Sequence, residues 1–435
     1  MTYEQAVQYL EEASSFGIKP GLERITALLA ELGNPEKSYK IVHVTGTNGK
    51  GSVTTYVSYA LFNSGLRVGR FTSPHLESYT ERMHINDANI SEDGFGALIE
   101  RVKPAVDAII AKGIEAPTQF EILTAVAFLF FQEQEVDYAV VEVGLGGLLD
   151  STNVVTPVVS VITNVSIDHQ AYCGNTIEEI AHHKAGIIKE GIPVVTAAQG
   201  GALNVIEDEA TAKHAPLYVF NKRFGIGSRR SMKTGQMVTV STEDGQPAML
   251  FTSLVGIHQA VNISCALMTV RLLMDQDSSI SEETMREGFA RATWPGRFEI
   301  KKHNDRTYIF DGAHNAAGAE AFGMTYKELF KDEPKTIIMA ILSDKDEQAI
   351  IREVVKPQDT VYTVPAPTPR SENPLALGKR ISDMVKTAEV EVSTTVSDAL
   401  TTATETTKSG DTIVVCGSLY ILGEARAWLQ QQDSH

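Results

Sequence analysis

The stretch HVTGTNGKGS, residues 43–52, is the part of the sequence that decides the fold. It completes a short apolar run, residues 40–46, and precedes apolar positions that recur at helical spacing. Such a run, ending in glycine before an amphipathic segment, predicts a buried strand, a loop and the first turn of a helix. The common phosphate-loop pattern, G-x-x-x-x-G-K-[ST], fits only in part, because Val44 replaces the first glycine and Gly51 directly follows the lysine.

The composition of this loop favours a nucleotide site. Several small residues in a row allow backbone N–H groups to point at one anion. The helix that follows adds the positive end of its dipole, and Lys50 adds a point charge. Ser52 is suited to a phosphate or to Mg²⁺. The alternative is an ordinary glycine-rich turn between a strand and a helix.

The rest of the N-terminal half predicts a mostly parallel sheet. Continuous Val/Ile runs alternate with helical segments, which is typical of a parallel sheet covered on both faces. The expected buried strands are residues 40–46, 66–72, 137–144, 158–165 and 192–197, with an apolar helix at 120–134. From about residue 217, short β runs and an Asp-Gly turn at 244–245 predict a small antiparallel insertion.

A second α/β series follows two helices expected at 256–274 and 280–292. Pro295-Gly296 is the expected break before it. We therefore predict an α/β protein of two domains. Residues 1–295 form a domain with a P-loop-type, mostly parallel sheet flanked by helices, and residues 296–435 form a smaller, Rossmann-like α/β domain.

The composition limits the classes of protein. The 435 residues carry a formal net charge of −17, which argues against broad nucleic-acid binding but permits a small anionic substrate in a local basic pocket. Cys173, Cys265 and Cys416 form no metal or disulfide spacing, which favours a reducing cytoplasm. No apolar run approaches the ~20 residues that span a membrane, and the start of the sequence has no export-signal pattern.

Glu142 and His169 are candidate metal ligands by position. Glu142 ends the apolar run DYAVVE, and His169 follows the run VVSVITNV by a few residues. The carboxyl ends of parallel strands meet at the edge where ligands bind in open sheets. A carboxylate on a buried strand is costly unless it is paired or binds a metal. A salt-bridged glutamate and a structural histidine are the alternatives.

The string GTNGKGS resembles the phosphate loop of the Mur ligase superfamily, ATP-dependent enzymes that join an amino acid to a carboxylate. Within it, the chain resembles the folylpolyglutamate synthase/dihydrofolate synthase family over nearly its full length. The other matching strings, in order, are FTSPHL (71–76), ERMHIN (81–86), PTQFEILTAVAF (117–128), EVGLGG (142–147), DH (168–169), HKAGIIK (183–189), GIHQAVN (256–262), WPGRFE (294–299), DGAHN (311–315), LSDKD (342–346) and GSLYILGEAR (417–426). Only 45 residues precede Gly46, too few for the extra N-terminal domain of the peptidoglycan branch.

The resemblance implies a set of site residues. The implied ATP site comprises Thr47, Asn48, Gly49, Lys50, Gly51, Ser52, Asn262, Arg297 and Asp311. Mg²⁺ is implied at two sites, with ligands among Ser73, Glu142, His169 and a carbamylated Lys184. The folate and the glutamate are implied to meet Arg82, Gln119, Phe120, His314 and Ser418. The catalytic roles fall to Lys50, Lys184, His169 and Arg297.

Several of these residues have a structural alternative. Judged from the residues alone, Lys184 is first of all a solvated helix lysine, Arg297 can be part of a linker salt bridge, and Phe120 can be plain core. Asp311 and His314 belong to a string, DGAHN, that also suits a turn and a helix cap. The sequence alone leaves these alternatives open.

The implied reaction transfers the γ-phosphate of ATP to a substrate carboxylate, and the amine of L-glutamate attacks the resulting acyl phosphate. We expect folylpolyglutamate synthase activity. Dihydrofolate synthase activity, which uses dihydropteroate, is the alternative or a second activity of one bifunctional enzyme. A P-loop NTPase switch is less favoured because it leaves DGAHN and WPGRFE unexplained, and a non-catalytic protein because Lys50 and Glu142 are present.

The same resemblance implies the partners and the setting. We expect small-molecule substrates only, with no nucleic acid and no membrane, and a monomer in the cytoplasm. The segment 71–86 is expected to form a loop over the folate. The two domains are expected to close on each other and to exclude water from the acyl phosphate.

Overall fold

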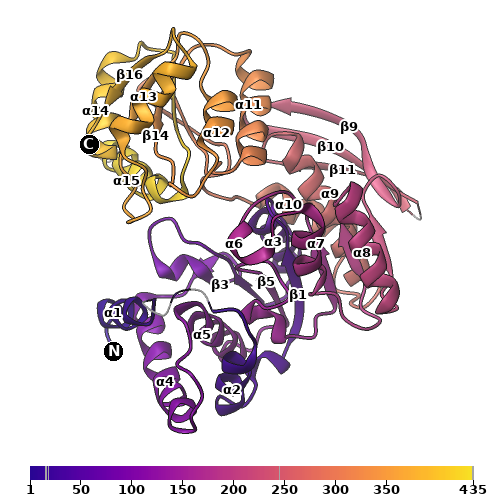
Figure 1. The fold of residues 1–435 in the computed structure, drawn as a ribbon. Coiled ribbons are helices and arrows are strands. Elements are labelled where there is room, and N and C mark those ends of the chain that lie inside the picture. Colours follow the sequence, from indigo (N-terminus) through magenta and orange to yellow (C-terminus); the bar gives the residue numbers. More distant parts are fainter. Residues whose placement is uncertain (15–16, 18, 244, 434–435) are drawn as a thin grey trace. The chain divides into compact units, whose positions relative to one another are not determined.

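The computed structural model describes residues 1–14, 17, 19–243 and 245–433, which divide into two compact units (Figure 1). Unit 1 contains the described residues up to 228, together with 238–251 and 261–292. Unit 2 contains 229–237, 252–260 and the described residues from 293 onward. The chain therefore passes between the units more than once, and each unit is described by itself.

Unit 1 is built on an eight-stranded sheet in the order β4-β3-β2-β5-β1-β6-β7-β8. The strands are β1 (Lys40–Thr45), β2 (Val68–Phe71), β3 (Met83–Ile85), β4 (Ala88–Asn89), β5 (Tyr138–Glu142), β6 (Val159–Ile162), β7 (Val194–Thr196) and β8 (Leu217–Val219). All neighbouring strands pair in parallel except at one edge, where β3 is antiparallel to both of its neighbours, β2 and β4. The central strands β5 and β6 are buried along their whole length, which explains their continuous apolar sequences.

Helices cover both faces of this sheet (Figure 1). They are α1 (Tyr3–Ser14), α2 (Glu23–Glu31), α3 (Lys50–Asn63), α4 (Glu92–Ala111), α5 (Gln119–Glu133), α6 (Gln170–Cys173), α7 (Ile177–Ala185), α8 (Gly200–Ala212) and α10 (Glu282–Arg291). One apolar core joins α1, α2, α4 and α5 to strand residues such as Ile41 and Val141. Elsewhere, α3 packs on α10, where the rings of Tyr56 and Phe289 meet edge-on at 5.6 Å.

The neighbouring strands β1 and β6 have outgoing connections that run in opposite directions. From β1 the chain passes through α3 to β2 on one side, and from β6 it passes through α7 to β7 on the other. In open α/β sheets, ligands bind outside the carboxyl ends of the strands at such a switch point. The loops that follow Thr45 and Ile162 are therefore where a ligand is expected.

The predicted antiparallel insertion is present, but it starts later than residue 217. Its strands are β9 (Phe224–Met232), β10 (Gly235–Thr242) and β11 (Gly245–Thr252), in the order β11-β10-β9. Residues 217–219 instead form β8, which pairs in parallel with β7 in the large sheet. A run of three residues has too few alternations to reveal its pairing partner. Asp244 of the predicted turn lies outside the described residues.

Among the residues that the structure describes, one helix is long and apolar enough by composition to cross a membrane. This is α9 (Ile257–Met274), and 72% of it is buried inside the protein. A core helix passes the same compositional test, so the burial of α9 accounts for its apolar character.

Unit 2 carries a six-stranded sheet in the order β12-β13-β17-β14-β15-β16. The strands are β12 (Glu299–His303), β13 (Arg306–Phe310), β14 (Lys335–Met339), β15 (Thr360–Thr363), β16 (Glu389–Val392) and β17 (Thr412–Cys416). Only β12 is antiparallel to its neighbour. The helices are α11 (Ala316–Phe330), α12 (Glu347–Val354), α13 (Pro374–Met384), α14 (Val396–Thr406) and α15 (Leu422–Asp433).

The segment 71–86, predicted as a loop, is regular in its second half. Residues 79–82 form a 3-10 helix, and β3 pairs antiparallel with β2, so that His84 lies opposite Arg70. We call residues 72–82 the acceptor loop below, because this segment is expected to lie over the folate, whose carboxylate accepts the glutamate. The prediction of a loop through residue 86 was wrong because a strand of three residues is too short to show an alternation in sequence.

Candidate active site

The phosphate-loop candidate has a backbone that only glycine adopts easily. Gly46 and Gly49 have φ angles of 153° and 83°, a region that other residues rarely occupy. A Cβ on Gly46 would overlap the hydroxyl of Thr163, and one on Gly49 would overlap the side-chain oxygen of Asn262. The helix α3 begins after Gly49 without a capping side chain, which suits the binding of an anion at this end.

The loop is held in shape by the segment that follows β6. The backbone N–H groups of Thr47 and Asn48 donate to the backbone and side-chain oxygens of Asn164, each at 3.0 Å. The side chain of Asn164 returns a bond to the carbonyl of Asn48 at 2.9 Å, and the hydroxyl of Thr163 donates to the same carbonyl at 2.6 Å. The two loops at the switch point therefore form one hydrogen-bonded body.

Lys50 lies over this loop. Its ammonium donates to the carbonyls of Gly46 and Thr47 at 3.0 and 3.1 Å. Gly51 and Ser52 follow in the first turn of α3 and are buried. The loop therefore presents one cation and the start of a helix at the same place, as phosphate binding requires.

Two neighbouring strands bring Ser73 and Glu142 together. Glu142 ends β5 and is only 4% exposed, and its carboxylate accepts the backbone N–H of Ser73 at 3.1 Å. Strand β5 lies between β1 and β2, so these residues are at the same carboxyl edge as the phosphate loop. A buried carboxylate at this edge attracts a cation.

The glycine-rich segment after Glu142, residues 144–147, is packed between two other predicted elements. A Cβ on Gly144 would lie 2.5 Å from the ring of Phe120, and one on Gly147 would lie 2.8 Å from the carbonyl oxygen of His183. The segment thus touches the start of α5 on one side and the end of α7 on the other. Neither contact leaves room for a side chain.

Lys184 is buried. It is therefore not the solvated helix lysine of the alternative interpretation. Burial disfavours the ammonium, and the nearby charge of Lys50 adds to this, so that the pKa of Lys184 falls to about 7. Cys173 and Asp168 act on the same group in the opposite direction. A neutral amine is the form that reacts with carbon dioxide, so the site suits a carbamate.

His169 follows β6 and directly precedes α6. It adopts a left-handed backbone conformation, with a φ of 52°, immediately before α6. Its side chain is 42% exposed, and its Nε2 lies 4.0 Å from the carboxylate of Asp168. The loop after β6 therefore supplies both the brace of the phosphate loop and an exposed imidazole at the same edge.

Arg82 and Gln119 both contact Tyr79 of the acceptor loop, and Phe120 follows Gln119 at the start of α5. Arg82 donates to Nδ1 of His75 at 2.8 Å and lies over the ring of Tyr79 at 5.3 Å. Gln119 donates to the hydroxyl of Tyr79 at 2.8 Å. Phe120 is partly buried and packs against the core: its ring stacks on the buried Phe71 at 5.9 Å and lies beside Gly144.

His75 is neutral in this cluster. Burial and the neighbouring Arg82 lower the pKa of His75 to about 3. Because Nδ1 accepts the bond from Arg82, the ring proton resides on Nε2. The cluster therefore offers aromatic faces together with a cation and an imidazole N–H donor, groups that suit a flat substrate with anionic groups.

In unit 2, Asp311 and Arg297 lie together at the carboxyl end of β13. Asp311 is buried and accepts the backbone N–H groups of Phe298 and Ala313, each at 2.8 Å. Burial raises the pKa of Asp311, and the nearby Arg297 opposes that rise. A Cβ on Gly312 would overlap the guanidinium of Arg297. Arg297 is thus held beside the DGAHN string.

His314 and Ser418 lie at the same edge, because β13 and β17 are parallel neighbours. Nδ1 of His314 is 2.8 Å from the carbonyl of Gly312. Ser418 is 1% exposed and accepts the backbone N–H of Tyr420 at 3.3 Å. Both residues therefore also serve the local turn geometry.

Two cations near this edge were not among the predicted residues. Arg370 and Lys345 both pair with the carboxylate of Asp344, at 3.5 and 3.8 Å. Their loops are joined, because the N–H of Ser343 donates to the carbonyl of Arg370 at 2.9 Å. The guanidinium of Arg370 also lies 3.4 Å from the hydroxyl of Tyr420. LSDKD was recognised as a matching string, but nothing in it singled out the lysine.

Asp150 is a further residue that sequence reasoning missed. It is buried, and it accepts the N–H groups of Leu145 and Thr152 at 2.8 and 3.0 Å and the hydroxyl of Thr152 at 2.6 Å. The hydroxyl of Thr152 is in turn 2.8 Å from Nε2 of His43 on β1. This buried chain anchors the 144–147 segment to the centre of the sheet. The Asp-Ser-Thr sequence is a turn-and-cap signal that could have indicated it.

The predicted site residues therefore gather in two groups. One group, in unit 1, contains Thr47, Asn48, Gly49, Lys50, Gly51, Ser52, Ser73, Arg82, Gln119, Phe120, Glu142, His169, Lys184 and Asn262. The other, in unit 2, contains Arg297, Asp311, His314 and Ser418. Each group lies along the carboxyl edge of the sheet of its own unit.

The described residues contain no cluster of three or more His, Cys, Asp or Glu side chains arranged for a metal ion. The predicted ligand set is of another kind, because it combines one hydroxyl, one carboxylate, one imidazole and one carbamate. The hydroxyl, carboxylate and carbamate oxygens of this set, completed by water and phosphate, suit Mg²⁺. The buried Glu142 carboxylate and the neutral tendency of Lys184 fit this set.

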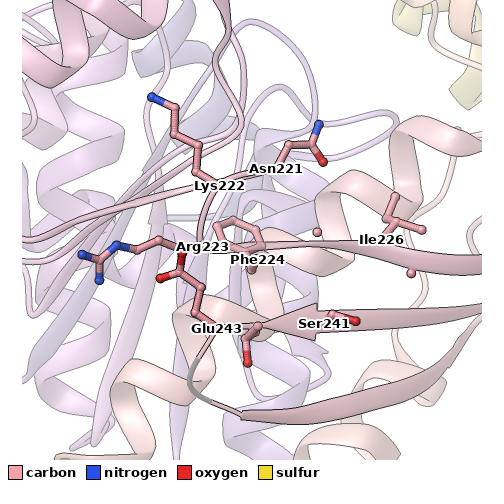
Figure 2. Close-up of a pocket in the computed structure, with 10 residues that line it drawn as sticks. Asn221, Lys222, Arg223, Phe224, Ile226, Ser241 and Glu243 are labelled. Carbon is pink, nitrogen blue, oxygen red and sulfur yellow. The ribbon is translucent and has the colours of Figure 1, made fainter.

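A pocket of about 290 Å³ lies away from these residues, on the antiparallel insertion (Figure 2). It is lined by residues 221–227 and 241–243. In Figure 2, the side chains of Lys222 and Arg223 extend in the opposite direction to Ile226 and Ser241. None of the predicted site residues lines this pocket.

Two family models match the chain and together cover both units. The Mur ligase middle domain matches residues 44–270, which include the phosphate loop, Glu142, Lys184 and Asn262. The dihydrofolate synthetase C-terminal domain matches residues 297–428, which include Arg297 and the DGAHN string. The fold and the site thus define an ATP-dependent ligase that forms a C–N bond.

Individual relatives narrow the class. The chain is 37% identical to the dihydrofolate synthase/folylpolyglutamate synthase of Bacillus subtilis, over 98% of this chain and 99% of that protein. The folylpolyglutamate synthase of Mycobacterium tuberculosis complexed with ADP superposes with a TM-score of 0.90, at 32% identity over 98% of both chains. An FPGS–AMPPCP–folate complex superposes with a TM-score of 0.84, at 33% identity over 99% of this chain and 100% of that chain.

The chain belongs to the folylpolyglutamate synthase/dihydrofolate synthase family. The resemblance and the fold class predicted from the sequence are confirmed, and so is the class of ATP-dependent ligase. Complexes of relatives with ADP and AMPPCP support ATP as the nucleotide, and small molecules as substrates.

Proposed function

We propose that this chain joins L-glutamate to the carboxylate of a folate or a folylpolyglutamate, using ATP and an acyl-phosphate intermediate. The observation that carries the proposal is the shared carboxyl edge of unit 1, where the phosphate loop, Glu142 and Lys184 lie beside the acceptor loop. A relative solved with AMPPCP and folate supports both substrates. We call the substrate whose carboxylate receives the glutamate the acceptor.

Dihydrofolate synthesis, in which dihydropteroate is the acceptor, is a second candidate function. The relative from Bacillus subtilis carries both activities in its name, at 37% identity over nearly the full length of both chains. The two reactions share ATP and glutamate and differ in the acceptor. Both acceptors combine a flat ring system with a carboxylate, and the acceptor loop offers aromatic faces and a cation for such a molecule.

We assign residues 1–295 to an ATP-binding domain of the Mur ligase type and residues 296–435 to a glutamate-ligase domain. The boundary between the two compact units near residue 292 supports this assignment, and residues 229–237 and 252–260 are the parts of the first domain that cluster with unit 2. Each domain then supplies one carboxyl edge: the first binds ATP and the acceptor, and the second binds glutamate and contributes Arg297.

ATP is proposed to lie on the phosphate loop, with its phosphates at the N-terminus of α3 and on Lys50. The glycine backbone of residues 46–49 and the bracing by Asn164 support this, because a preorganised loop binds an anion without a further ordering cost. Asn262, which touches Gly49, is proposed to meet the nucleotide, and Arg297 and Asp311 to contact it from unit 2.

Two Mg²⁺ ions are proposed, with ligands from Ser73, Glu142, His169 and a carbamate on Lys184. When bound, they neutralise the phosphate charge and make the γ-phosphorus easier to attack. The carboxylate of Glu142 is oriented by the N–H of Ser73, and the low pKa of Lys184 keeps part of its amine neutral for carbamylation.

In the proposed reaction, a carboxylate oxygen of the acceptor attacks the γ-phosphorus of ATP, and ADP leaves. The neutral amine of glutamate then attacks the carbonyl carbon of the acyl phosphate. A tetrahedral intermediate collapses, and inorganic phosphate leaves with one oxygen from the original carboxylate. The amine loses one proton, and an amide remains. The protein contributes positioning and charge, with Lys50 and Arg297 opposite the developing negative charge.

Glutamate is proposed to bind at the carboxyl edge of unit 2. It carries two carboxylates and one ammonium, so its site needs two cations and one anion. Lys345, Arg370 and Asp344 form such a set, in loops joined by a hydrogen bond and close to Tyr420. His314 and Ser418 lie on adjoining strand ends and are proposed to contact the same substrate.

The setting is proposed to be the cytoplasm, with the protein acting as a monomer and without nucleic-acid partners. The three cysteines are free and buried, which supports a reducing compartment. The formal net charge of −17 opposes nucleic-acid binding.

The experiment that tests the proposed function measures ADP release from the purified chain with ATP and Mg²⁺. Acceptor and glutamate are added separately and together, and tetrahydrofolate and dihydropteroate are compared as acceptors. We expect rapid ADP release only when acceptor and glutamate are both present. Equal ADP release with and without acceptor would contradict the proposal. Turnover with glutamate and dihydropteroate, but not with glutamate and tetrahydrofolate, would select the second candidate function.

A further inference from the structure

We propose that Tyr3, at the start of α1, is a positioning residue for the acceptor loop: its hydroxyl fixes the part of the loop that carries Tyr79 and thereby sets the affinity for the acceptor. The inference rests on the proposed function and deepens it. It concerns an N-terminal helix that none of the matching sequence strings includes.

The hydroxyl of Tyr3 bonds to two consecutive residues of the loop. It accepts the backbone N–H of Tyr79 at 3.1 Å and lies 2.9 Å from the hydroxyl of Ser78. Ser78 is the residue that caps the 3-10 helix at 79–82, where its oxygen accepts the N–H of Thr80 at 3.2 Å. One side-chain oxygen on α1 is thus tied to the turn on which the second half of the loop is built.

Aromatic contacts connect the same elements. The ring of Tyr3 lies 5.7 Å from the ring of Phe95 on α4, and Phe95 stacks on Tyr79 at 6.0 Å. Phe95 is fully buried. Helix α1 and the acceptor loop therefore share one core neighbour, and the Tyr3 hydroxyl supplies the directional contact that packing alone does not give.

The acceptor loop is held together by hydrogen bonds between its own residues. The carboxylate of Glu81 accepts the backbone N–H groups of Leu76, Glu77 and Ser78, at 2.9, 2.7 and 2.6 Å. These bonds tie residues 76–78 to the 3-10 helix that carries Tyr79. Tyr3 is an attachment outside the proposed site, whereas Gln119, which also bonds to Tyr79, is proposed to contact the acceptor.

Fixing Tyr79 fixes the groups that surround it. The ring of His75 lies 4.4 Å from the ring of Tyr79, and the guanidinium of Arg82 lies over the same ring. If the loop loses its attachment to α1, these groups occupy more positions before the acceptor binds. The acceptor must then order them, and its affinity falls. The chemical step, which depends on groups at the phosphate loop, is unaffected.

The test uses Tyr3→Phe, which removes one oxygen and keeps the ring. The matched control is Tyr9→Phe on the same helix, where the tyrosine ring lies under the ammonium of Lys103 at 5.5 Å. We expect Tyr3→Phe to raise the KM for the acceptor about three- to tenfold, the loss associated with one net hydrogen bond. We expect kcat and the KM for ATP to change less than about twofold, and Tyr9→Phe to change none of the three.

A second measurement needs no substrate. Amide hydrogen exchange of residues 76–82 in the free protein should be faster in Tyr3→Phe than in the wild type and in Tyr9→Phe. Failure of the wild type to use any acceptor would reject the proposed function and, with it, the role of Tyr3 in acceptor affinity. The exchange result would still decide whether Tyr3 fixes the loop. Wild-type exchange in Tyr3→Phe, or a loop that loosens while the acceptor KM stays unchanged, would overturn the inference. A fall in kcat and Tm shared by both variants would also overturn it.

Discussion

The two carboxyl edges of the molecule use different means to present charge. In unit 1, the edge is built from backbone: Gly46 and Gly49 shape a loop, Asn164 braces it, and the ammonium of Lys50 is bonded to its carbonyls. In unit 2, the edge is built from side chains, those of Arg297, Lys345 and Arg370. The loops at this edge are held by Asp, Asn and Ser side chains that accept backbone N–H groups. A loop of fixed backbone conformation needs particular residue types at particular positions, whereas a site built from side chains is compatible with many local sequences.

This difference has a chemical meaning. Phosphates are large, multiply charged and the same in every turnover, so a rigid cradle of N–H groups serves them well. A small amino acid must enter and leave and be distinguished from others, which calls for separate charged groups at set distances. The following predictions test whether the two edges divide the work in this way, beginning with the largest expected effect.

Removal of the phosphate-loop cation should have the largest effect. Lys50→Ala should reduce kcat/KM by about 100- to 1,000-fold, because a preorganised cation opposite the transferring phosphate is lost. Steady-state ADP release measures it. Lys40→Ala is the matched control, because Lys40 begins β1, at the end of that strand opposite the phosphate loop, and pairs with Asp277. If both variants lose activity equally, the effect belongs to the strand rather than to the phosphate site.

Lys184 tests the buried part of the same edge. Lys184→Ala should reduce kcat roughly 100-fold, because a metal-binding carbamate is removed, and added formate or acetate should restore part of the rate. Lys184→Arg keeps a cation but cannot form a carbamate, so it should remain inactive with or without the added acid. An active Lys184→Arg variant would show that the charge, and not the carbamate, is needed.

Arg370 tests the unit 2 edge. Arg370→Ala should raise the KM for glutamate by about tenfold, the usual cost of one charge-assisted contact, and leave the KM for ATP and for the acceptor unchanged. Kinetics with each substrate varied in turn measure this selectivity. Arg352→Ala, on the exposed face of α12, is the control. A rise in the KM for ATP instead would mean that the two edges do not divide the substrates.

The smallest effect concerns the buried chain beneath the unit 1 edge. Burial lowers the pKa of His43 to about 3, mainly through desolvation. The unfolded chain binds a proton near pH 6.5 that the folded chain refuses, so stability is lost as the pH falls below 6.5. Between pH 7 and 5.5 this histidine should account for about 1 kcal/mol of the loss in the free energy of unfolding.

Urea unfolding at the two pH values measures this contribution. His43→Gln should reduce the loss by that amount, whereas His214→Gln, at an exposed position, should leave it unchanged. An identical acid sensitivity in all three proteins would mean that His43 does not remain neutral in the folded chain.

The two edges also differ in how far the sequence could predict them. The strand-loop-helix at residues 40–63 followed from a local pattern, because the backbone geometry dictates glycine and the buried strand dictates Val and Ile. The parallel sheet followed for the same reason. The strand β3 and the place of β8 in the large sheet did not, because three residues show no period, and the pairing of such strands is decided by distant neighbours.

The side chains of the site were harder to predict than the fold. Lys184 looked like a surface lysine because its helix is rich in charge, and only the three-dimensional packing buries it. Asp150, Lys345 and Arg370 carry no distinctive spacing, and their roles arise from contacts between loops that lie far apart in sequence. Tyr3 is more than 70 residues from its partners in the acceptor loop.

The central claim is that the edge of unit 1 activates the acceptor carboxylate by transferring the γ-phosphate of ATP to it. The most direct test uses an acceptor whose reacting carboxylate is labelled with ¹⁸O. The account predicts that one labelled oxygen appears in the inorganic phosphate and the other remains in the amide of the product. Phosphate that carries oxygen only from ATP and solvent water, with amide still being formed, would contradict it.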